Sequence, residues 1–229
     1  MINDVITYRE MCNRENTSLQ RGMNFELGGD YSVILMSVRP GAPYSDEISE
    51  DGSTLIYEGH DAPRNSENLV PKNINQPERT PKGSLTQNGK FHKSAQMAAQ
   101  GKHPQALVRV YEKIKQGLWT YNGLFALENS WIENDGTRNV FKFQLKLMEK
   151  DEVVTSNRPV RIGMGRLIPS WVKQEVFTRD GGKCVECGAT DELHFDHILP
   201  FSKGGTSSTP DNIQLLCARH NLQKRDKII

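Results

Sequence analysis

Apolar and polar positions alternate in short runs through the first two thirds of the chain, which predicts a β-rich domain. Glycine, proline and asparagine separate the runs, as expected at turns. The predicted strands cover residues 30–38, 53–57, 105–111, 123–133 and 138–147, and one helix is predicted over residues 93–101. Several short strands around one or two helices favour a curled β-sheet or a barrel.

Two polar stretches interrupt this pattern. Residues 61–89 are rich in proline and asparagine and are predicted as a long surface loop. Residues 155–169 contain two prolines, two glycines and three arginines, which is typical of an interdomain linker. We therefore expect a domain over residues 1–155, a linker over residues 156–168 and a second domain over residues 169–229.

The C-terminal part has a different pattern. A helix is predicted to begin at Ser170, whose hydroxyl group suits an N-cap. A cysteine knuckle, a β-hairpin around residues 194–200, a loop over residues 202–210 and a final helix over residues 211–224 are expected to follow. The whole chain is therefore predicted to be α+β, with few helices in its N-terminal domain.

Composition narrows the function only slightly. The net charge is +1 and 36% of the residues are hydrophobic, so the chain lacks the strongly basic balance of many nucleic-acid binders. No apolar run reaches the roughly 18 to 20 residues that a membrane span needs. The polar N-terminus does not resemble a secretory signal. We expect an intracellular, cytoplasmic protein without a membrane partner.

Three of the four cysteines lie close to a histidine near the C-terminus, while Cys12 stands apart. Their spacing forms two pairs, because Cys184 and Cys187 enclose two residues, as do Cys217 and His220. Two such pairs provide a closed tetrahedral zinc site, and a small module gains stability from the metal. The alternative is three buried thiols and a surface histidine. The pattern favours structural Zn²⁺.

Five further polar residues follow the first cysteine pair in the same module. His194, Asp196 and His197 occupy a strand-like run, and Asn212 and Asn221 follow downstream. Alternation along a strand would place His194 and Asp196 on one face and His197 on the other. None of the five is required by the zinc site, so they are candidates for a second site.

In this order, the Asp-His pair, the middle asparagine and the His-Asn element resemble HNH (ββα-metal) nuclease modules of the zinc-knuckle type. The resemblance implies that His197 is the general base that activates water, and that Asp196 and Asn221 hold one Mg²⁺ or Mn²⁺. Asn212 would brace the loop that carries His197, and His194 would assist near the phosphate. Oxygen ligands suit a hard cation, and a neutral imidazole suits a base. The alternative is a structural knuckle with an inactive site.

The N-terminal domain contains a Tyr-Ser-hydrophobic strand, a Tyr-Ser-Asp-Glu turn and a strand that ends in Tyr-Glu-Gly. A Leu-Thr-x-x-Asn segment, a Val-Arg-Val strand and a Tyr-Asn-Gly triad follow, with Asn122 at the middle of the triad in place of the usual aspartate. Over residues 20–150 these motifs resemble the SET- and RING-associated (SRA, or YDG) domain, which flips a modified cytosine out of DNA into a pocket.

The resemblance implies a modified-base pocket. Tyr44 and Tyr57 would supply the aromatic faces for the flipped base. Asp46 or Glu47 would accept a hydrogen bond from the cytosine N4 amine, where thymine presents an oxygen. Glu58 occupies a position where a small hydroxyl residue is frequent, so we expect it to affect the choice among C5 substituents. The alternative is that these tyrosines are ordinary strand aromatics.

The two resemblances together predict a modification-dependent DNA restriction endonuclease of prokaryotic type. It would bind double-stranded DNA that carries 5-methylcytosine or 5-hydroxymethylcytosine and hydrolyse nearby phosphodiester bonds. Because one HNH site cuts one strand, a homodimer is expected. The alternatives are a structure-specific repair or recombination nuclease, a non-catalytic reader of modified DNA, and an N-terminal domain that binds a protein partner.

Overall fold

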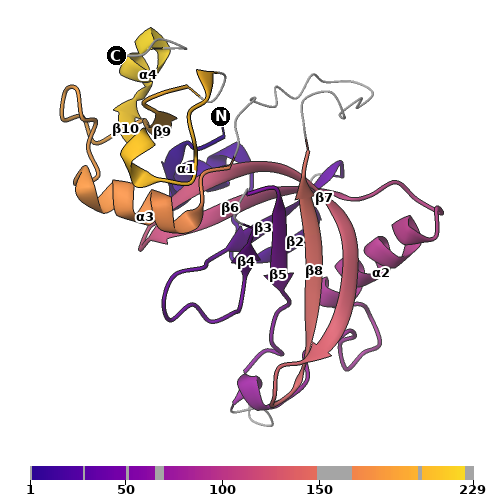
Figure 1. The fold of residues 1–229 in the computed structure, drawn as a ribbon. Helices are drawn as coiled ribbons and strands as arrows, with labels where there is room; N and C mark the ends of the chain where they lie inside the picture. Colours follow the sequence, from indigo (N-terminus) through magenta and orange to yellow (C-terminus); the bar gives the residue numbers. More distant parts are fainter. Residues whose placement is uncertain are drawn as a thin grey trace.

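A computed structural model describes residues 2–27, 29–49, 52–64, 70–148, 167–200 and 203–224. It contains an eight-stranded sheet, a separate two-stranded sheet and four α-helices within these ranges, which confirms the α+β class (Figure 1). Among the described residues, no helix is long and apolar enough to cross a membrane.

The large sheet is mostly antiparallel and follows the strand order β2-β3-β6-β7-β8-β5-β4, with β1 paired to β7. Its path ends at β2 and β4, so the described strands do not close into a barrel. All five expected strands are present, as β3, β5, β6, β7 and β8. The strands are β1 Val5–Thr7, β2 Met23–Leu27, β3 Tyr31–Met36, β4 Glu47–Ile48, β5 Thr54–Glu58, β6 Leu107–Lys115, β7 Leu118–Asn134 and β8 Asn139–Leu147.

Strand β7 holds the sheet together because it pairs with β6 through its first half and with β8 through its second. A register shift between Leu127 and Asn129 lies where it leaves β6 and continues along β8. Figure 1 shows β7 and β8 as long, bent strands, with the C-terminal module at one end of β7. The large sheet and the C-terminal module therefore meet at the same strand.

The helices are α1 Tyr8–Arg14, α2 Gln87–Ala99, α3 Ser170–Arg179 and α4 Ala218–Lys224. Helix α1 was not predicted, although Thr7 and Glu10 form a complete capping box at its start. Helix α2 begins earlier than expected because Thr86 caps it by accepting a hydrogen bond from the amide of Gly89 at 3.2 Å. The expected cap of α3 was wrong, since Ser170 is the first helical residue and makes no capping bond.

The main core lies between the large sheet and α2. Phe91 of α2 is fully buried, with its ring centroid 5.1 Å from that of Phe25 and 5.8 Å from that of Phe143. Leu167 is also buried in this core, where it lies against Gly52. Most of the predicted linker, residues 156–166, lies outside the described residues. The domain boundaries therefore stay predictions.

The C-terminal module differs from expectation in its second half. Strand β9 (Leu193–His197) pairs with β10 (Ile213–Cys217), and only the residues after Cys217 form α4. The predicted helix over residues 211–224 was therefore wrong for its first half. Residues 213–217 are mostly buried and form a short apolar run, which fits a strand as well as a helix. The direct turn from β10 into α4 brings His220 close to Cys217.

Candidate functional site

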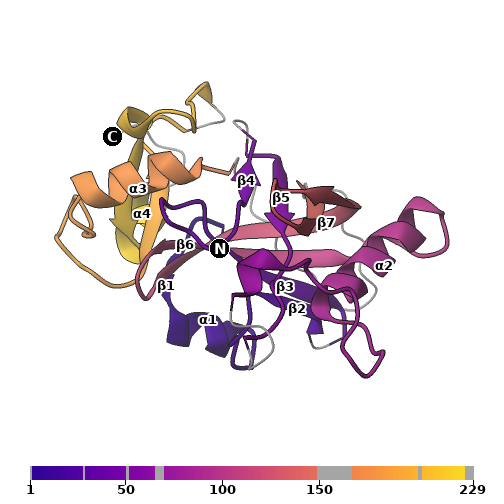
Figure 2. The same ribbon diagram turned by 90° about the horizontal axis from the view of Figure 1, so that it is seen from below.

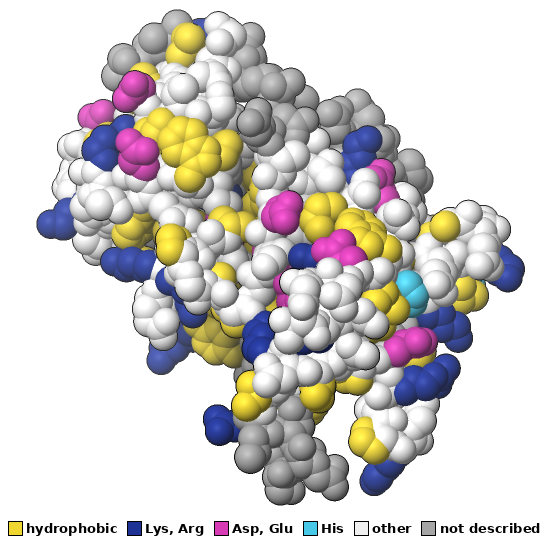
Figure 3. All heavy atoms as spheres, turned by 60° about the horizontal axis from the view of Figure 1, so that its bottom comes forward, with side chains coloured by type: hydrophobic (Ala, Val, Ile, Leu, Met, Phe, Trp, Pro, Cys, Tyr) yellow, Lys and Arg dark blue, Asp and Glu magenta, His cyan; other side chains and the backbone are white. Residues whose placement is uncertain are grey.

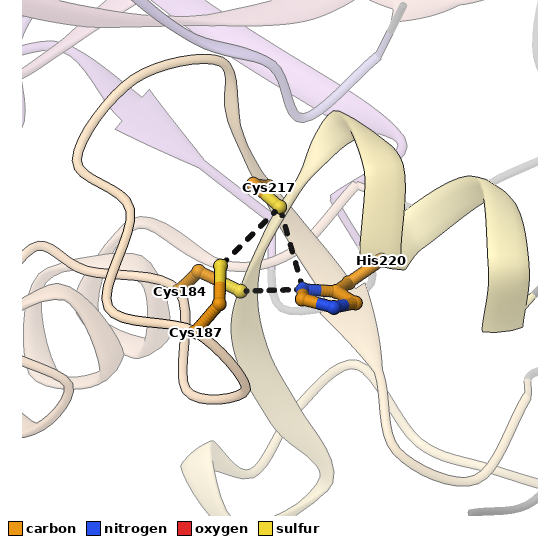
Figure 4. Close-up of side chains that lie close together, drawn as sticks. All are labelled: Cys184, Cys187, Cys217 and His220. Carbon is orange, nitrogen blue, oxygen red and sulfur yellow. Dashed lines mark hydrogen bonds between the residues drawn. The ribbon is translucent and has the colours of Figure 1, made fainter.

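The four predicted zinc ligands come together at the junction of three elements. Cys184 and Cys187 lie in the turn after α3, Cys217 ends β10, and His220 lies in the first turn of α4 (Figure 4). Their ligand atoms all lie within 4.8 Å of one another. Such a set of three thiols and one imidazole is a donor set that Zn²⁺ takes in structural sites.

The separations fit one tetrahedral metal ion. The Sγ atoms of Cys187 and Cys217 are 3.9 Å apart, and Nδ1 of His220 is 3.3 Å from Sγ of Cys184 and 3.4 Å from Sγ of Cys217. Zinc bonds of about 2.3 Å to sulfur and about 2.0 Å to nitrogen would give tetrahedral edges of about 3.8 Å and about 3.5 Å. The residues therefore fit zinc through Nδ1 of His220.

His197 ends β9 and is half-buried beside the loop that follows. Its Nε2 lies 2.8 Å from the hydroxyl of Ser207. Burial lowers the pKa of His197 below its ordinary value, and Lys224 adds to this effect while Asp196 opposes it. A lowered pKa keeps the imidazole neutral near neutral pH, which a general base requires.

Asn212 is hydrogen-bonded to the loop that follows His197. Its Oδ1 accepts a hydrogen bond from the amide of Leu199 at 2.8 Å, and its Nδ2 donates to the carbonyls of Leu199 and Thr206. Gly205 permits this closure because a Cβ at that position would lie 1.8 Å from the carbonyl oxygen of Leu199. The side chain of Asn212 thus joins both ends of the loop.

Asp196 pairs with a lysine that the sequence analysis did not identify. Nζ of Lys224 lies 2.6 Å from Oδ2 of Asp196 and also donates a hydrogen bond to the carbonyl of His197. Lys224 is 1% exposed, so the ammonium group of this ion pair is buried while the carboxylate of Asp196 still reaches solvent. The sequence could have indicated that Lys224 lies near the site, because it follows Asn221 by three residues and such residues share one side of a helix.

Asp196 and Asn221 have donors of the type that Mg²⁺ or Mn²⁺ takes, namely a carboxylate and an amide oxygen. The Asp196 side chain is 21% exposed and Asn221 is half-buried, so solvent reaches both. Helix α4, which carries Asn221, packs against the strand that carries Asp196. The residues therefore fit a hard divalent cation, with Lys224 already holding one carboxylate oxygen.

His194 has a different partner from the one expected. It is 7% exposed, and its Nδ1 lies 2.6 Å from Oδ1 of Asp4 in the N-terminal segment. Burial works to raise the pKa of Asp4, but hydrogen bonding with His194 helps to hold it below its ordinary value. Through Nδ1, His194 therefore forms a contact between the two parts of the chain, and its assisting role near the phosphate stays a prediction.

A pocket of about 520 Å³ lies where the C-terminal ends of strands β3 and β5 meet the connection between β6 and β7. Three basic side chains and an aromatic wall line it, together with the buried carboxylate of Asp46. The residues include Tyr8, Arg21, Arg39, Tyr44, Asp46, Tyr57, His60, Lys113 and Trp119. On the face shown in Figure 3, lysine and arginine side chains are scattered among acidic ones rather than gathered into one patch.

The structure separates the two candidate acceptors. Asp46 is buried and lines the pocket, with its Oδ2 accepting from the amide of Ser37 at 3.0 Å and its Oδ1 from the amide of Glu58 at 3.1 Å. Glu47 is exposed on β4 and does not line the pocket. Of the two, only Asp46 is placed to contact a ligand inside the pocket.

The expected aromatic pair was incomplete, because His60 lies between the two tyrosines. Its ring stacks on Tyr44 with centroids 5.3 Å apart and an interplanar angle of 14°, and its Nε2 lies 2.9 Å from the hydroxyl of Tyr57. Asn88 holds the backbone of His60 through two hydrogen bonds of 2.8 Å. Burial lowers the pKa of His60 to about 4, so the imidazole is neutral at neutral pH.

Glu58 does not face the pocket, contrary to expectation. Its carboxylate lies 3.5 Å from Arg138 and 3.6 Å from Lys142, and it accepts a hydrogen bond from the amide of Ser45 at 2.9 Å. This buried network fixes the turn that carries Asp46. Glu58 therefore acts on the pocket only through the position of its neighbour.

The pKa of Asp46 should make the free energy of unfolding depend on pH. Burial raises its pKa from 3.8 to about 7, so between these values the folded protein binds a proton that the unfolded chain has lost. The free energy of unfolding should therefore fall as pH rises from about 4 to about 7. Asp46→Asn should remove this part of the slope in thermal melts, while Glu47→Gln should keep it. A slope that is unchanged in Asp46→Asn would contradict the assignment.

The comparisons with known proteins concern the two halves separately. Residues 184–227 match the family model of the HNH endonuclease, which places an HNH domain there and implies nuclease activity. No match was found among curated proteins.

Similar solved structures include the SRA domain of SUVH5 in complex with hemi-methylated CG DNA, with a TM-score of 0.44 and 24% identity over 64% of this chain and 88% of that chain. The SUVH5 SRA domain bound to fully hydroxymethylated CG DNA has a TM-score of 0.42 and 22% identity over the same shares, 64% and 88%. Arabidopsis thaliana SUVH6 in complex with SAM has a TM-score of 0.41 and 20% identity over 86% of this chain and 31% of that chain.

Proposed function

We propose that this protein is a modification-dependent DNA endonuclease, in which the pocket at Asp46 reads a flipped, C5-modified cytosine and the HNH module cuts the DNA nearby. The observation that carries the proposal is the presence, in one chain, of an HNH match over residues 184–227 and an aromatic pocket that contains a buried carboxylate. The nuclease module alone would not account for the pocket, and the pocket alone would not account for the nuclease module.

The nuclease half would work through residues of β9 and α4. His197 takes a proton from the attacking water, and Ser207 and Asn212 keep its ring and its loop in place. Asp196 and Asn221 would hold one Mg²⁺ or Mn²⁺, which stabilises the charge that develops on the phosphate and the leaving oxygen. The zinc site holds α4 against β10, so it fixes the position of Asn221 indirectly.

The reader half would bind the base by stacking and by one charge-assisted hydrogen bond. Tyr44 and His60 offer flat aromatic surfaces, and the carboxylate of Asp46 accepts a hydrogen bond from the N4 amine of cytosine. Thymine presents an oxygen at this position, which the carboxylate repels. The basic side chains of Arg21, Arg39 and Lys113 line the pocket and would attract the phosphates beside the flipped nucleotide.

One HNH site cuts one strand, so we propose that a double-strand break takes either a homodimer with two sites or two successive cuts by one site. Analytical ultracentrifugation on a modified duplex would separate a dimer from a monomer that acts twice.

The binding half of the proposal can be tested without cutting. His197→Ala protein loaded with zinc should bind a duplex with 5-methylcytosine or 5-hydroxymethylcytosine about tenfold or more tightly than the unmodified duplex, which is the discrimination that one methyl-sized group gives in a fitted pocket. The preference between the two modifications would identify the C5 substituent that fits. Equal affinity for all three duplexes would contradict the modified-base pocket.

The role of Asp46 has its own test. Above the pKa of this group, Asp46→Asn should lose the discrimination between a 5-methylcytosine duplex and the same duplex with thymine, because an amide can donate to the thymine oxygen. Glu47→Gln is the matched control and should discriminate as the wild type does, since Glu47 is exposed outside the pocket. Unchanged discrimination in Asp46→Asn would remove Asp46 from the base contact.

A further inference from the structure

The junction between the large sheet and the nuclease module contains a fully buried charged cluster. Lys173 of α3 donates hydrogen bonds to Oε2 of Glu112 at 3.0 Å and to Oδ1 of Asn122 at 2.8 Å, and Nδ2 of Asn122 donates to the same oxygen of Glu112 at 3.0 Å. All three residues are 0% exposed. A buried ammonium group is tolerated only with such partners, so the helix cannot leave the sheet without exposing or stranding these charges.

A second connection runs through β1. Val5 pairs with Thr120 of β7, while Asp4 forms a β-bridge with His194 of β9, and the amide of Phe195 donates to the carbonyl of Asn3 at 3.1 Å. Strand β1 therefore joins the large sheet to the strand that carries Asp196 and His197. Figure 2 shows β1 between the large sheet and the C-terminal module.

Apolar packing closes the junction. Val5 of β1 and Ile114 of β6 belong to one buried cluster with residues of α3, β9 and β10, including Val172, Phe195 and Ile213. Nζ of Lys115 also lies 4.9 Å from the ring centroid of Phe177. The hydrophobic core of the nuclease module is thus shared with the sheet, unlike the cores of two domains that are joined only by a flexible tether.

The same elements that hold the nuclease also form the wall of the base pocket. Lys113 directly follows Glu112 on β6, and Trp119 lies three residues before Asn122 on β7. The N-terminal segment contributes Tyr8 to the pocket and Asp4 to the junction. Pocket and nuclease are therefore attached to opposite sides of the same short pieces of backbone.

We propose that this junction holds the HNH site at a fixed position relative to the base pocket, so that Lys173, Glu112, Asn122 and Asp4 are positioning residues that determine where the DNA is cut. The inference rests on the proposed function and deepens it. A flexible linker would let the nuclease reach many phosphates, whereas a rigid junction presents one or a few of them to His197.

The test maps cut positions on end-labelled duplexes that carry a single modified cytosine. Wild-type protein should cut at one preferred distance from that base. Two variants should spread the cuts over many positions. The first is Lys173→Met, which leaves Glu112 without its cation. The second is the double variant Lys173→Met with Glu112→Gln, called the neutral pair, which leaves no unpaired buried charge and so guards against misfolding. Affinity for the modified duplex should stay unchanged. Glu175→Gln, on the exposed face of the same helix, should cut as the wild type does.

Two results would overturn the inference: broadly spread cuts by the wild type, or cuts by the neutral pair that stay as sharply placed as those of the wild type. Scanning calorimetry separates this inference from the proposed function, because it needs no DNA. Wild-type protein should unfold in one transition, since the two parts share a core, and the neutral pair should unfold in two. If cutting ignores base modification, the proposed function fails, and the number of transitions still decides the junction.

Discussion

Replacing His197 by alanine should lower the rate of DNA cutting by about 10²- to 10⁴-fold, which is the usual contribution of a general base. Binding of the modified duplex should be unchanged, because the pocket lies on other elements, far from β9 in the sequence. Single-turnover cutting in saturating Mg²⁺ or Mn²⁺ measures the chemical step alone. The separation of cutting from binding is what distinguishes an enzyme from a reader that has lost its nuclease activity.

The matched control is His103→Ala, which removes an exposed histidine outside both sites and should cut at the wild-type rate. Ser207→Ala should give an intermediate rate, because it removes only the hydrogen bond to Nε2 of His197. If His197→Ala cuts as fast as the wild type, the proton acceptor is another group and the assignment of β9 as the catalytic strand is wrong.

Removal of zinc should unfold the C-terminal module. Structural zinc sites contribute apparent free energies of about 10 to 16 kcal/mol in isolated zinc-finger peptides, which equals or exceeds the stability of a whole small domain. Cys217→Ala, or treatment with a strong chelator, should therefore abolish cutting and make residues 169–229 sensitive to protease. The main core around Phe91 does not include this module, so the reader half should stay folded and bind modified DNA, but with lower stability because it loses the cluster that Val5 and Ile114 share with the module.

Cys12→Ala is the control for this experiment, because Cys12 is half-buried in the N-terminal part and lies outside the ligand cluster. It should retain one equivalent of zinc per chain and full cutting. Metal analysis and limited proteolysis report both properties. A chelated protein that keeps a protected C-terminal module would contradict a structural role for zinc.

Much of the nuclease site could be predicted from the sequence, because its chemistry is local. The zinc ligands are two pairs at fixed spacing, so a knuckle and one helical turn suffice to bring each pair together. The bracing bonds of Asn212 also span a short loop. The strand at residues 138–147 was predicted by its apolar pattern, and β8 confirms it.

The remaining features depend on contacts that are distant in sequence. Strand β1 is three residues long and forms only because β7 and β9 lie beside it, which no local pattern indicates. His60 was overlooked because its position depends on Asn88, which holds its backbone from α2. Lys173 looked like an ordinary charged residue on an amphipathic helix, since its partners lie on β6 and β7. Only the capping box at Thr7 was a local signal that could have revealed α1.

The measurement that tests the central claim most directly is cutting, with Mg²⁺ or Mn²⁺, of otherwise identical duplexes that carry cytosine, 5-methylcytosine or 5-hydroxymethylcytosine. His197→Ala protein, prepared in the same way, serves as the control for contaminating nucleases. We predict that the wild type cuts modified duplexes and leaves the unmodified duplex intact, and that the variant cuts none. Equal cutting of all three duplexes by the wild type would contradict the claim that a modified base directs this nuclease.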